Sequence, residues 1–584
     1  MTFFKNVLST LTALFIYSFI GAIFFAVTVG GIIALSEQDA PEVKNNSVLY
    51  IGLHGVVQER VIEDPFEEIF SDDVEQRIPL LKTLEAISNA KTDDRIKGIF
   101  LDNGILAAGY SSLHEIRSAL EDFKESGKFI YSYGEIMTEA NYYVASVADE
   151  IYLNPIGSLE FNGLSANVVF LKGLFDKLDI EAQIFRVGTY KSAVEPFFRK
   201  DMSDANREQV TSFINDIHGN VLKSISTSRN ISIEELKNIS SEMLVREPED
   251  ALSYGLISKV GYKNEIKDQI KTALGIKADD KIEYVNILNY IKTLDKGYSS
   301  DRVAVIVASG EIVSGKGDSE SIGSAKFVKA IKAARESKRV KAVVIRINSP
   351  GGSMLASDVI WNEIMLTKAE KPVIASMSDM AASGGYYMAM PCDTIIAQPM
   401  TITGSIGIFG LLPNLGKFME NKLGITFDGV NTGRFSNLYR VSSSLTDAEK
   451  QIIQNSVDRG YETFTTKASE GRNMNIEDLK AVASGRVWTG AQAKEHGLVD
   501  KLGSYNDALE IAAAAAGIEE DYMVTFYPTL KSKWEEFFSS IAGETETKIL
   551  NHQYGEMAKY INMIKDMEKY QGIQARLPFE LEIK

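Results

Sequence analysis

The sequence predicts an α/β protein made of two tandem repeats that follow an N-terminal transmembrane helix. Three features support this prediction: a long uncharged apolar run near the N-terminus, self-similarity at a nearly constant offset, and short apolar runs that alternate with longer amphipathic segments. The 584 residues are too many for one hydrophobic core, so several domain-sized units are expected.

The apolar run covers residues 11–35 and carries no charge over 25 positions. About 20 apolar residues are enough for a helix to cross a bilayer. No small-residue cleavage site directly follows the run, so we expect residues 1–45 to be a retained anchor in the lipid bilayer. Lys5 precedes the run and three acidic residues (Glu37, Asp39 and Glu42) follow it, so the positive-inside rule places the body of the protein outside the cytoplasm.

The rest of the chain resembles itself at an offset of about 244 residues. RIKGIFLDNG, from Arg95, matches RVKAVVIRIN, from Arg339 (339 − 95 = 244). The pair Tyr142-Tyr143 matches Tyr386-Tyr387 at the same offset (386 − 142 = 244). Such regularity indicates an internal duplication, with a first repeat at 46–295 and a second at 301–530.

Within the second repeat, three short β-branched runs are predicted to be buried parallel strands: Val303–Val307, Ala342–Ile347 and Val373–Met377. Lys326–Ser337 and Met354–Thr367 lie between them and have helical spacing with charged outer faces. This alternation is typical of βαβ crossovers.

The remaining residues, 531–584, are predicted to form a helical tail. Trp534–Phe538 and Tyr554–Tyr570 have the pattern of amphipathic helices. They would cover a sheet edge or form an oligomer contact, and the sequence does not decide between the two.

Composition excludes several classes of function. A net charge of −17 argues against a nucleic-acid partner, because phosphate binding needs a basic face. The five histidines have no metal-ligand spacing, so we expect neither a metal nor another cofactor. The single cysteine, Cys392, excludes a disulfide within the chain.

The two repeats differ at a few positions that are suited to chemistry. Gly351 and Gly352 follow a predicted strand of the second repeat, and adjacent glycines let backbone N–H groups converge on an oxyanion. Ser383 is followed by Gly384, whereas Glu139 occupies the corresponding place in the first repeat (383 − 139 = 244). Taken alone, the glycines fit a tight turn and the serine fits a helix N-cap.

Lys191 differs in the opposite sense, because the first repeat keeps a lysine where the second has Ser436 (436 − 191 = 245). Most lysines are solvated surface residues. The two differences are nevertheless complementary: the first repeat lacks the serine and the second repeat lacks the lysine.

At these positions the chain closely resembles the tandem-repeat signal peptide peptidases of the SppA family, over residues 1 to about 575. The motifs that carry the resemblance are INSPGGS from Ile347, MAASGGYYMA from Met380, TGSIGI from Thr403 and GTYKSAVEPF from Gly188. The resemblance implies tandem domains of the Clp-protease/crotonase fold (a ββα superhelix) and a serine protease with a Ser/Lys dyad.

The same resemblance assigns roles and surroundings. It makes Ser383 the nucleophile, Lys191 the general base and Ser405 a residue that orients the lysine. It implies a bacterial inner-membrane protein whose catalytic body lies on the periplasmic side, which degrades signal peptides and forms a homo-oligomer, expected to be a tetramer.

The proposed chemistry requires a neutral lysine. Its pKa must fall well below the usual ~10.4, which burial in an apolar site achieves. Phe197 and Phe198 would supply such surroundings, unless they are only core residues.

Two alternatives stay open: a Ser-His protease with His496 or His218 as the base, and a non-catalytic membrane scaffold. An acyl-CoA enzyme of the crotonase type would share the oxyanion chemistry, but the predicted anchor and outside topology argue against a supply of CoA. The sequence also leaves open whether the dyad forms within one chain or between two.

Overall fold

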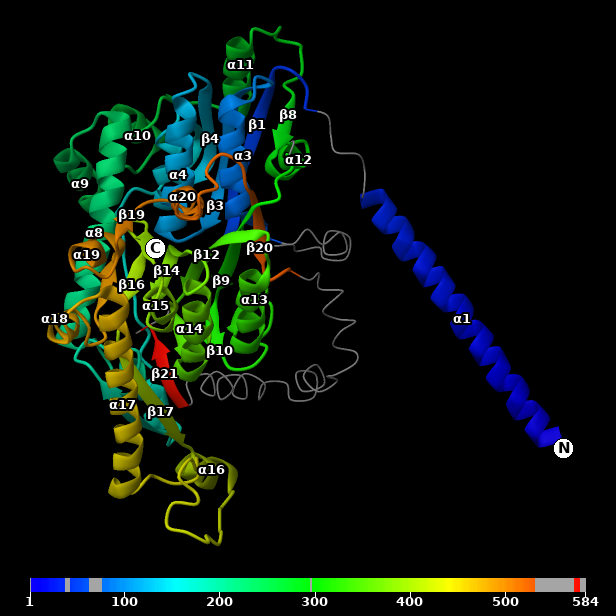
Figure 1. The fold of residues 1–584 in the computed structure, drawn as a ribbon. Helices are drawn as coiled ribbons and strands as arrows, with labels where there is room; N and C mark the ends of the chain where they lie inside the picture. The colour runs from blue at the N-terminus through cyan, green and yellow to red at the C-terminus, as the bar shows by residue number, and fades with distance from the viewer. Residues whose placement is uncertain (1, 37–42, 62–75, 295–296, 531–571, 578–584) are drawn as a thin grey trace.

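The computed structural model describes residues 2–36, 43–61, 76–294, 297–530 and 572–577 (Figure 1). The first repeat lies above the second in this view, and both are α/β units with helices packed on sheets.

The predicted membrane segment falls within α1 (Thr2–Ser36), a single long helix. Side chains at position 22 and from 25 to 36 lie outside the described residues. In the part of the chain that was described, no helix meets the length and apolarity needed to cross a membrane.

The first repeat contains one sheet with the strand order β2-β1-β3-β4-β5-β7, and β8 pairs with β1. Every pairing in this sheet is parallel, as predicted for βαβ crossovers. The elements of this repeat are β1 (Ser47–Gln58), β2 (Arg77–Pro79), α3 (Leu80–Thr92), β3 (Ile96–Ala107), α4 (Tyr110–Lys124), β4 (Phe129–Met137), α5 (Glu139–Ala145), β5 (Glu150–Leu159), α6 (Lys172–Lys177), β6 (Glu181–Val187), α7 (Glu195–Phe198), α8 (Asp204–Arg229), α9 (Ile233–Ser241), α10 (Pro248–Ser253), β7 (Lys259–Val260), α11 (Lys263–Leu274), β8 (Tyr284–Asn286) and α12 (Ile287–Lys292).

The second repeat repeats this plan with the strand order β18-β16-β14-β12-β9-β20, and β15 joins β14 to β19. Its elements are β9 (Arg302–Ser309), β10 (Glu311–Val313), β11 (Ser321–Gly323), α13 (Ser324–Glu336), β12 (Val340–Ser349), β13 (Gly351–Ser353), α14 (Met354–Lys368), β14 (Val373–Ala382), α15 (Gly384–Ala389), β15 (Thr394–Ala397), β16 (Ile402–Gly404), β17 (Ile408–Asn414), α16 (Gly416–Leu423), α17 (Asp447–Arg472), α18 (Ile476–Val482), β18 (Val487–Thr489), α19 (Gly490–Glu495), β19 (Lys501–Leu502), α20 (Tyr505–Ala516) and β20 (Met523–Tyr527). The three predicted strands and two predicted helices of this repeat are therefore confirmed, as β9, β12, β14, α13 and α14.

A third sheet joins segments that are distant in the sequence, in the order β11-β10-β13-β21-β17-β6. β6 comes from the first repeat and pairs antiparallel with β17 of the second. β21 (Gly572–Arg576) comes from the C-terminal region and lies between β13 and β17, antiparallel to both. This sheet brings the two repeats and the C-terminal strand to one place.

The duplication predicted from the sequence is visible in individual hydrogen bonds. The Tyr142 hydroxyl donates to the Leu256 carbonyl at 2.7 Å in the first repeat, and Tyr386 donates to Leu498 at 3.0 Å in the second. The long helices α8 and α17 both have 26 residues and begin at a Ser or Thr N-cap. The two repeats therefore share buried contacts as well as topology.

A buried ion-pair cluster ties the repeats together. The Arg346 guanidinium on β12 lies 2.9 Å from a Glu59 oxygen and 2.7 Å from a Glu115 oxygen, and all three side chains are buried. Because both carboxylates belong to the first repeat, the cluster makes each repeat depend on the other for charge compensation.

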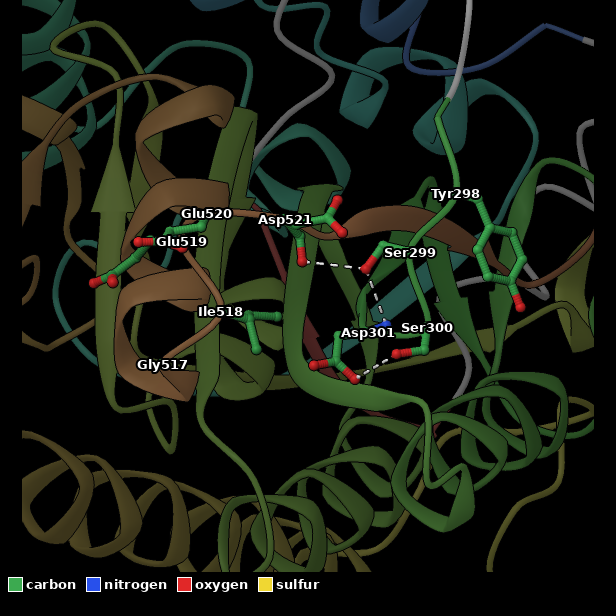
Figure 2. A pocket seen from close by; sticks show the side chains of 9 residues that line it. All are labelled: Tyr298, Ser299, Ser300, Asp301, Gly517, Ile518, Glu519, Glu520 and Asp521. Carbon is green, nitrogen blue, oxygen red and sulfur yellow. Dashed lines mark hydrogen bonds between the residues drawn. The ribbon is translucent and has the colours of Figure 1, made fainter.

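The segment between the repeats is held by polar contacts that Figure 2 shows. The Ser299 hydroxyl donates to the Asp521 carbonyl at 3.2 Å and accepts the Asp301 N–H at 3.2 Å. These residues border a hollow of about 610 Å³ beside the turn after α20. The start of the second repeat is thus fastened to its end.

The predicted helical tail is corrected in part. Residues 572–577 belong to 531–584, yet five of them form the strand β21. The expected helices at Trp534–Phe538 and Tyr554–Tyr570 lie outside the described residues.

Candidate active site

Lys191 reaches the second repeat because β6 is built into the third sheet. β6 pairs with β17 so that Val187 lies opposite Ile408, and the chain then enters the loop that carries Lys191. Gly485 has a φ of +79°, and a Cβ on it would stand 2.7 Å from the Lys191 Cα. Only glycine permits this close approach, so the loop can lie against the second repeat.

Ser383 occupies a strained turn between β14 and α15. Its φ of 55° and ψ of −110° lie in a region that non-glycine residues rarely adopt, at a cost of about 1–3 kcal/mol. Its N–H donates to the Gly404 carbonyl at 2.8 Å, which holds the turn against β16. Strain of this kind persists only where the surrounding structure enforces it, and it fixes the direction of the hydroxyl.

The two candidate residues meet within one chain. The Lys191 amine lies 2.9 Å from the Ser383 hydroxyl oxygen. It also lies 3.0 Å from the Ser405 hydroxyl oxygen and 3.1 Å from the Ser405 carbonyl oxygen. The predicted proximity of amine and hydroxyl is therefore confirmed, and Ser405 is the third member of the contact.

Burial makes the Lys191 amine unusual. Its side chain has no exposed surface, and desolvation lowers its pKa well below the ordinary value of 10.5. An amine that is neutral near pH 7 has a free lone pair, so it can accept a proton from a hydroxyl at hydrogen-bond distance. The geometry thus suits proton transfer from Ser383 to Lys191.

The three glycines predicted to hold an oxyanion occupy different positions. Gly351 and Gly384 face one another, since a Cβ on Gly351 would stand 2.8 Å from the Gly384 nitrogen. The Gly351 N–H donates to the Ser349 hydroxyl at 3.2 Å. A Cβ on Gly352 would stand 2.1 Å from the Ile312 carbonyl oxygen, so its lack of a side chain permits pairing with β10.

The C-terminal strand β21 lies against these glycines. Gly351 is paired with Arg576 and Gly352 with Ala575. The Ala575 carbonyl oxygen would be 2.2 Å from a Cβ on Gly351 and 3.0 Å from one on Gly384. An extended segment of the chain therefore holds a carbonyl over the glycine pair, and neither Ala575 nor Ser383 has exposed surface.

The histidines considered as alternative bases have other partners. His218 Nε2 lies 3.5 Å from a Glu139 oxygen in the first repeat. The His496 ring packs against Trp488 with 4.2 Å between ring centroids. Across the described ranges, no group of three or more His, Cys, Asp or Glu side chains could hold a metal ion.

Sequence reasoning missed part of the site. Phe197, which was expected to surround Lys191, belongs to an apolar cluster with Phe175 and Phe409. The backbone of the second repeat comes close to Lys191 at Gly485, a residue that the sequence did not single out. The strand β21 was not foreseen, although Ile573, Ala575 and Leu577 alternate with polar residues as strand residues do.

Comparisons with known proteins agree with this geometry. The family model of Peptidase family S49 matches residues 122–277 and 365–519, one match in each repeat. Protease 4 of Haemophilus influenzae is 35% identical over 475 residues, which are 79% of this chain and 77% of that protein. Serine protease SPPA, chloroplastic, of Arabidopsis thaliana is 36% identical over 492 residues, covering 83% and 71% of the two chains. Protease 4 of Salmonella typhi is 36% identical over 466 residues, covering 77% and 74%.

The two family matches span more than half of the chain, and each coincides with one of the α/β repeats that meet at Lys191 and Ser383. The chain therefore belongs to peptidase family S49 and is a serine protease.

Proposed function

We propose that Ser383 is the nucleophile of this protease and that Lys191 is its general base and acid. The observation that carries the proposal is the 2.9 Å contact between the Ser383 hydroxyl and a fully buried lysine amine. Ser405 acts as a positioning residue, because its hydroxyl and carbonyl oxygens accept the other two amine hydrogen bonds and direct the lone pair at Ser383.

The reaction follows from these contacts. Lys191 takes the Ser383 hydroxyl proton as the serine oxygen bonds to the scissile carbonyl carbon, and the Gly384 N–H donates to the resulting oxyanion. The Gly351 N–H would join it only by leaving the Ser349 hydroxyl. The lysine ammonium then gives its proton to the leaving amine as the C–N bond breaks, which leaves an acyl ester on Ser383. Lys191 next deprotonates a water molecule, which attacks the ester carbonyl, and the proton returns to the Ser383 oxygen.

The substrate is a peptide bound as an added strand. The pairing of β21 with β13 on one side and β17 on the other supports this binding mode. Ala575 stands where the residue before the scissile bond would stand, and its side chain is fully buried among apolar residues such as Ile312. The cleft therefore favours a small residue at that position.

We further propose that the substrates are signal peptides left in a bacterial inner membrane, and that residues 11–35 anchor the protein there with its body on the periplasmic side. The support is the resemblance in the four motifs, the uncharged run and the acidic residues that follow it. A homo-oligomer, expected to be a tetramer, belongs to the same proposal. Fractionation of membranes after carbonate extraction tests the anchor, which would be excluded by full release of the protein.

The dyad is tested by labelling and peptide cleavage. The full-length protein, a Ser383→Ala variant and a Lys191→Ala variant are treated with a fluorophosphonate and with a synthetic signal peptide. The proposal expects labelling and cleavage to disappear in Ser383→Ala and to fall by about 10²–10⁴-fold in Lys191→Ala. A matched control, Lys200→Ala, changes an exposed lysine nearby and should keep full activity. Labelling of Ser383→Ala at the wild-type rate would refute the assignment.

A further inference from the structure

The first repeat has its own cleft at the place that corresponds to the active site. The cleft has a volume of about 590 Å³, and its walls include Ile105–Ala108 at the end of β3 and Glu139 at the start of α5. These positions correspond to Ser349–Gly352 and Ser383 in the second repeat (349 − 105 = 244; 383 − 139 = 244). Because a glutamate stands where the second repeat has the serine, this cleft has no nucleophile at that position, although the cavity itself is present.

A strand edge borders this cleft. β3 pairs with β4 only as far as Asn103, whereas its pairing with β1 continues to Ala107. Among the described residues, Ile105–Ala107 therefore has a neighbouring strand on one side only. In the second repeat the corresponding edge, β13, is paired with β21 on its other side. The first repeat thus offers the docking edge that its counterpart fills with a peptide strand.

The chemistry of the walls indicates what would bind there. Leu106, Ile217, Met400 and Ile402 make the walls largely apolar, and the charged side chains on them are all carboxylates: Glu139, Glu160 and Asp379. No lysine or arginine is among the lining residues. An apolar ligand that carries a positive charge complements such a surface.

Glu139 is the group best placed to receive that charge. Only 6% of the residue is exposed. One of its carboxylate oxygens accepts the N–H groups of Asn162 and Gly163 at 3.1 and 2.8 Å. The other lies 3.5 Å from His218 Nε2 but accepts no hydrogen bond among the described residues. A buried carboxylate oxygen that accepts no hydrogen bond is costly, and a ligand ammonium group would donate the bond that His218 does not.

The cleft is also close to the dyad. Met380 and Asp379, which line it, lie on β14, and Ser383 follows Met380 by three residues (383 − 380 = 3). An extended strand advances about 3.3 Å per residue, so the backbone from Met380 to Ser383 spans at most about 10 Å. A peptide of a few extended residues covers this distance.

We propose that the first-repeat cleft is a second peptide-binding site, in which an extended apolar segment carrying a lysine or a free amino terminus pairs with Ile105–Ala107 and places its ammonium group at Glu139. The inference rests on the proposed function, because it takes the ligand to be part of a peptide substrate. The site binds the basic part of a substrate while another part lies at Ser383. By contrast, the acidic hollow beside Asp301 has no buried carboxylate without a donor among its lining residues, and it carries no comparable inference (Figure 2).

Binding is measured on the full-length Ser383→Ala protein, which binds peptide without cleaving it. The probes are a fluorescein-labelled leucine–alanine peptide with one lysine, and the same peptide with norleucine in place of the lysine. In this background, Glu139→Gln should weaken binding of the lysine peptide at least about tenfold and change binding of the norleucine peptide much less. Ala107→Trp fills the cleft from an exposed position and should weaken binding of both peptides. Glu234→Gln, an exposed glutamate on α9, is the matched control and should change neither.

Three results would overturn the inference. In the first, both peptides bind the Glu139→Gln and Ala107→Trp variants as tightly as they bind the Ser383→Ala protein, which would mean that only the catalytic site is used. In the second, neither peptide shows saturable binding. In the third, Ala107→Trp changes the mass of the protein in solution, which would mean that a second copy of the chain covers the cleft. Failure of the proposed function would be distinguishable from these results, because it would appear as absent fluorophosphonate labelling in the wild-type protein.

Discussion

Replacing Lys191 by Met should change the stability of the protein in a way that depends on pH. The Lys191 side chain is fully buried and desolvation lowers its pKa, whereas in the unfolded chain its pKa is about 10.4. Between these two pKa values the unfolded chain binds one proton more than the folded protein. Stability therefore falls as pH decreases from ~10.4 towards the folded-state pKa.

The size of the effect follows from the buried, neutral amine. Each pH unit between the folded-state pKa and ~10.4 costs about 1.36 kcal/mol of unfolding free energy, because over that interval the folded protein holds the amine neutral while the unfolded chain protonates it. Methionine has a similar shape and no proton to lose. It also cannot donate the two hydrogen bonds to Ser405 or accept the one from Ser383, but that loss is independent of pH and shifts only the baseline. Over each pH unit of that interval, the wild type should gain about 1 kcal/mol of stability relative to Lys191→Met as the pH rises.

Thermal unfolding measures this difference. For cooperative units of 150–250 residues, 1 kcal/mol corresponds to about 2–4 °C in Tm, so the Tm difference between the two proteins should change by about 2–4 °C for each pH unit in that interval. Lys200→Met, at an exposed position, should show no such change. A Tm difference between Lys191→Met and the wild type that stays constant from pH 7 to pH 9 would refute the claim that Lys191 is neutral in the folded protein.

Three further predictions concern the cleft, the junction and the assembly. Gln574→Pro removes a backbone donor from the strand between β13 and β17, so it should unseat β21 and raise the rate of Ser383 labelling by a fluorophosphonate; an unchanged rate would mean that β21 does not limit access. Arg346→Met leaves Glu59 and Glu115 buried without their cation, so urea unfolding should show a loss of about 3–5 kcal/mol, and a loss below 1 kcal/mol would contradict the importance of the cluster. Because the dyad forms within one chain, mixing Ser383→Ala with Lys191→Ala protein should restore no peptide cleavage, whereas recovered activity would show that the dyad also forms between chains.

The duplication made much of the fold and the dyad predictable. Comparing the two repeats singled out Lys191 and Ser383, because each has a counterpart of different chemistry in the other repeat. The 2.9 Å contact confirms that they meet, while their catalytic roles stay a prediction. The strands β9, β12 and β14 were predictable because continuous β-branched runs are typical of buried parallel strands.

The rest of the site depends on contacts between distant segments. β21 has only five residues, and its strand conformation is set by pairing with β13 and β17, which local sequence does not encode. The burial of Lys191 likewise depends on β6 joining a sheet of the other repeat and on Gly485 lacking a side chain. One Glu139 carboxylate oxygen accepts no hydrogen bond because the backbone N–H groups of Asn162 and Gly163 both donate to the other oxygen, an arrangement that local sequence does not encode.

The most direct test of the account is the pH dependence of fluorophosphonate labelling at Ser383, with Lys191 present and with Lys191 replaced by Ala. We expect the wild-type rate to become level well below pH 10, because burial lowers the pKa of the amine, and to exceed the rate of the variant by at least about 10²-fold. A wild-type rate that still rises towards pH 10, as an ordinary lysine would require, or a variant that is labelled as fast as the wild type, would contradict it.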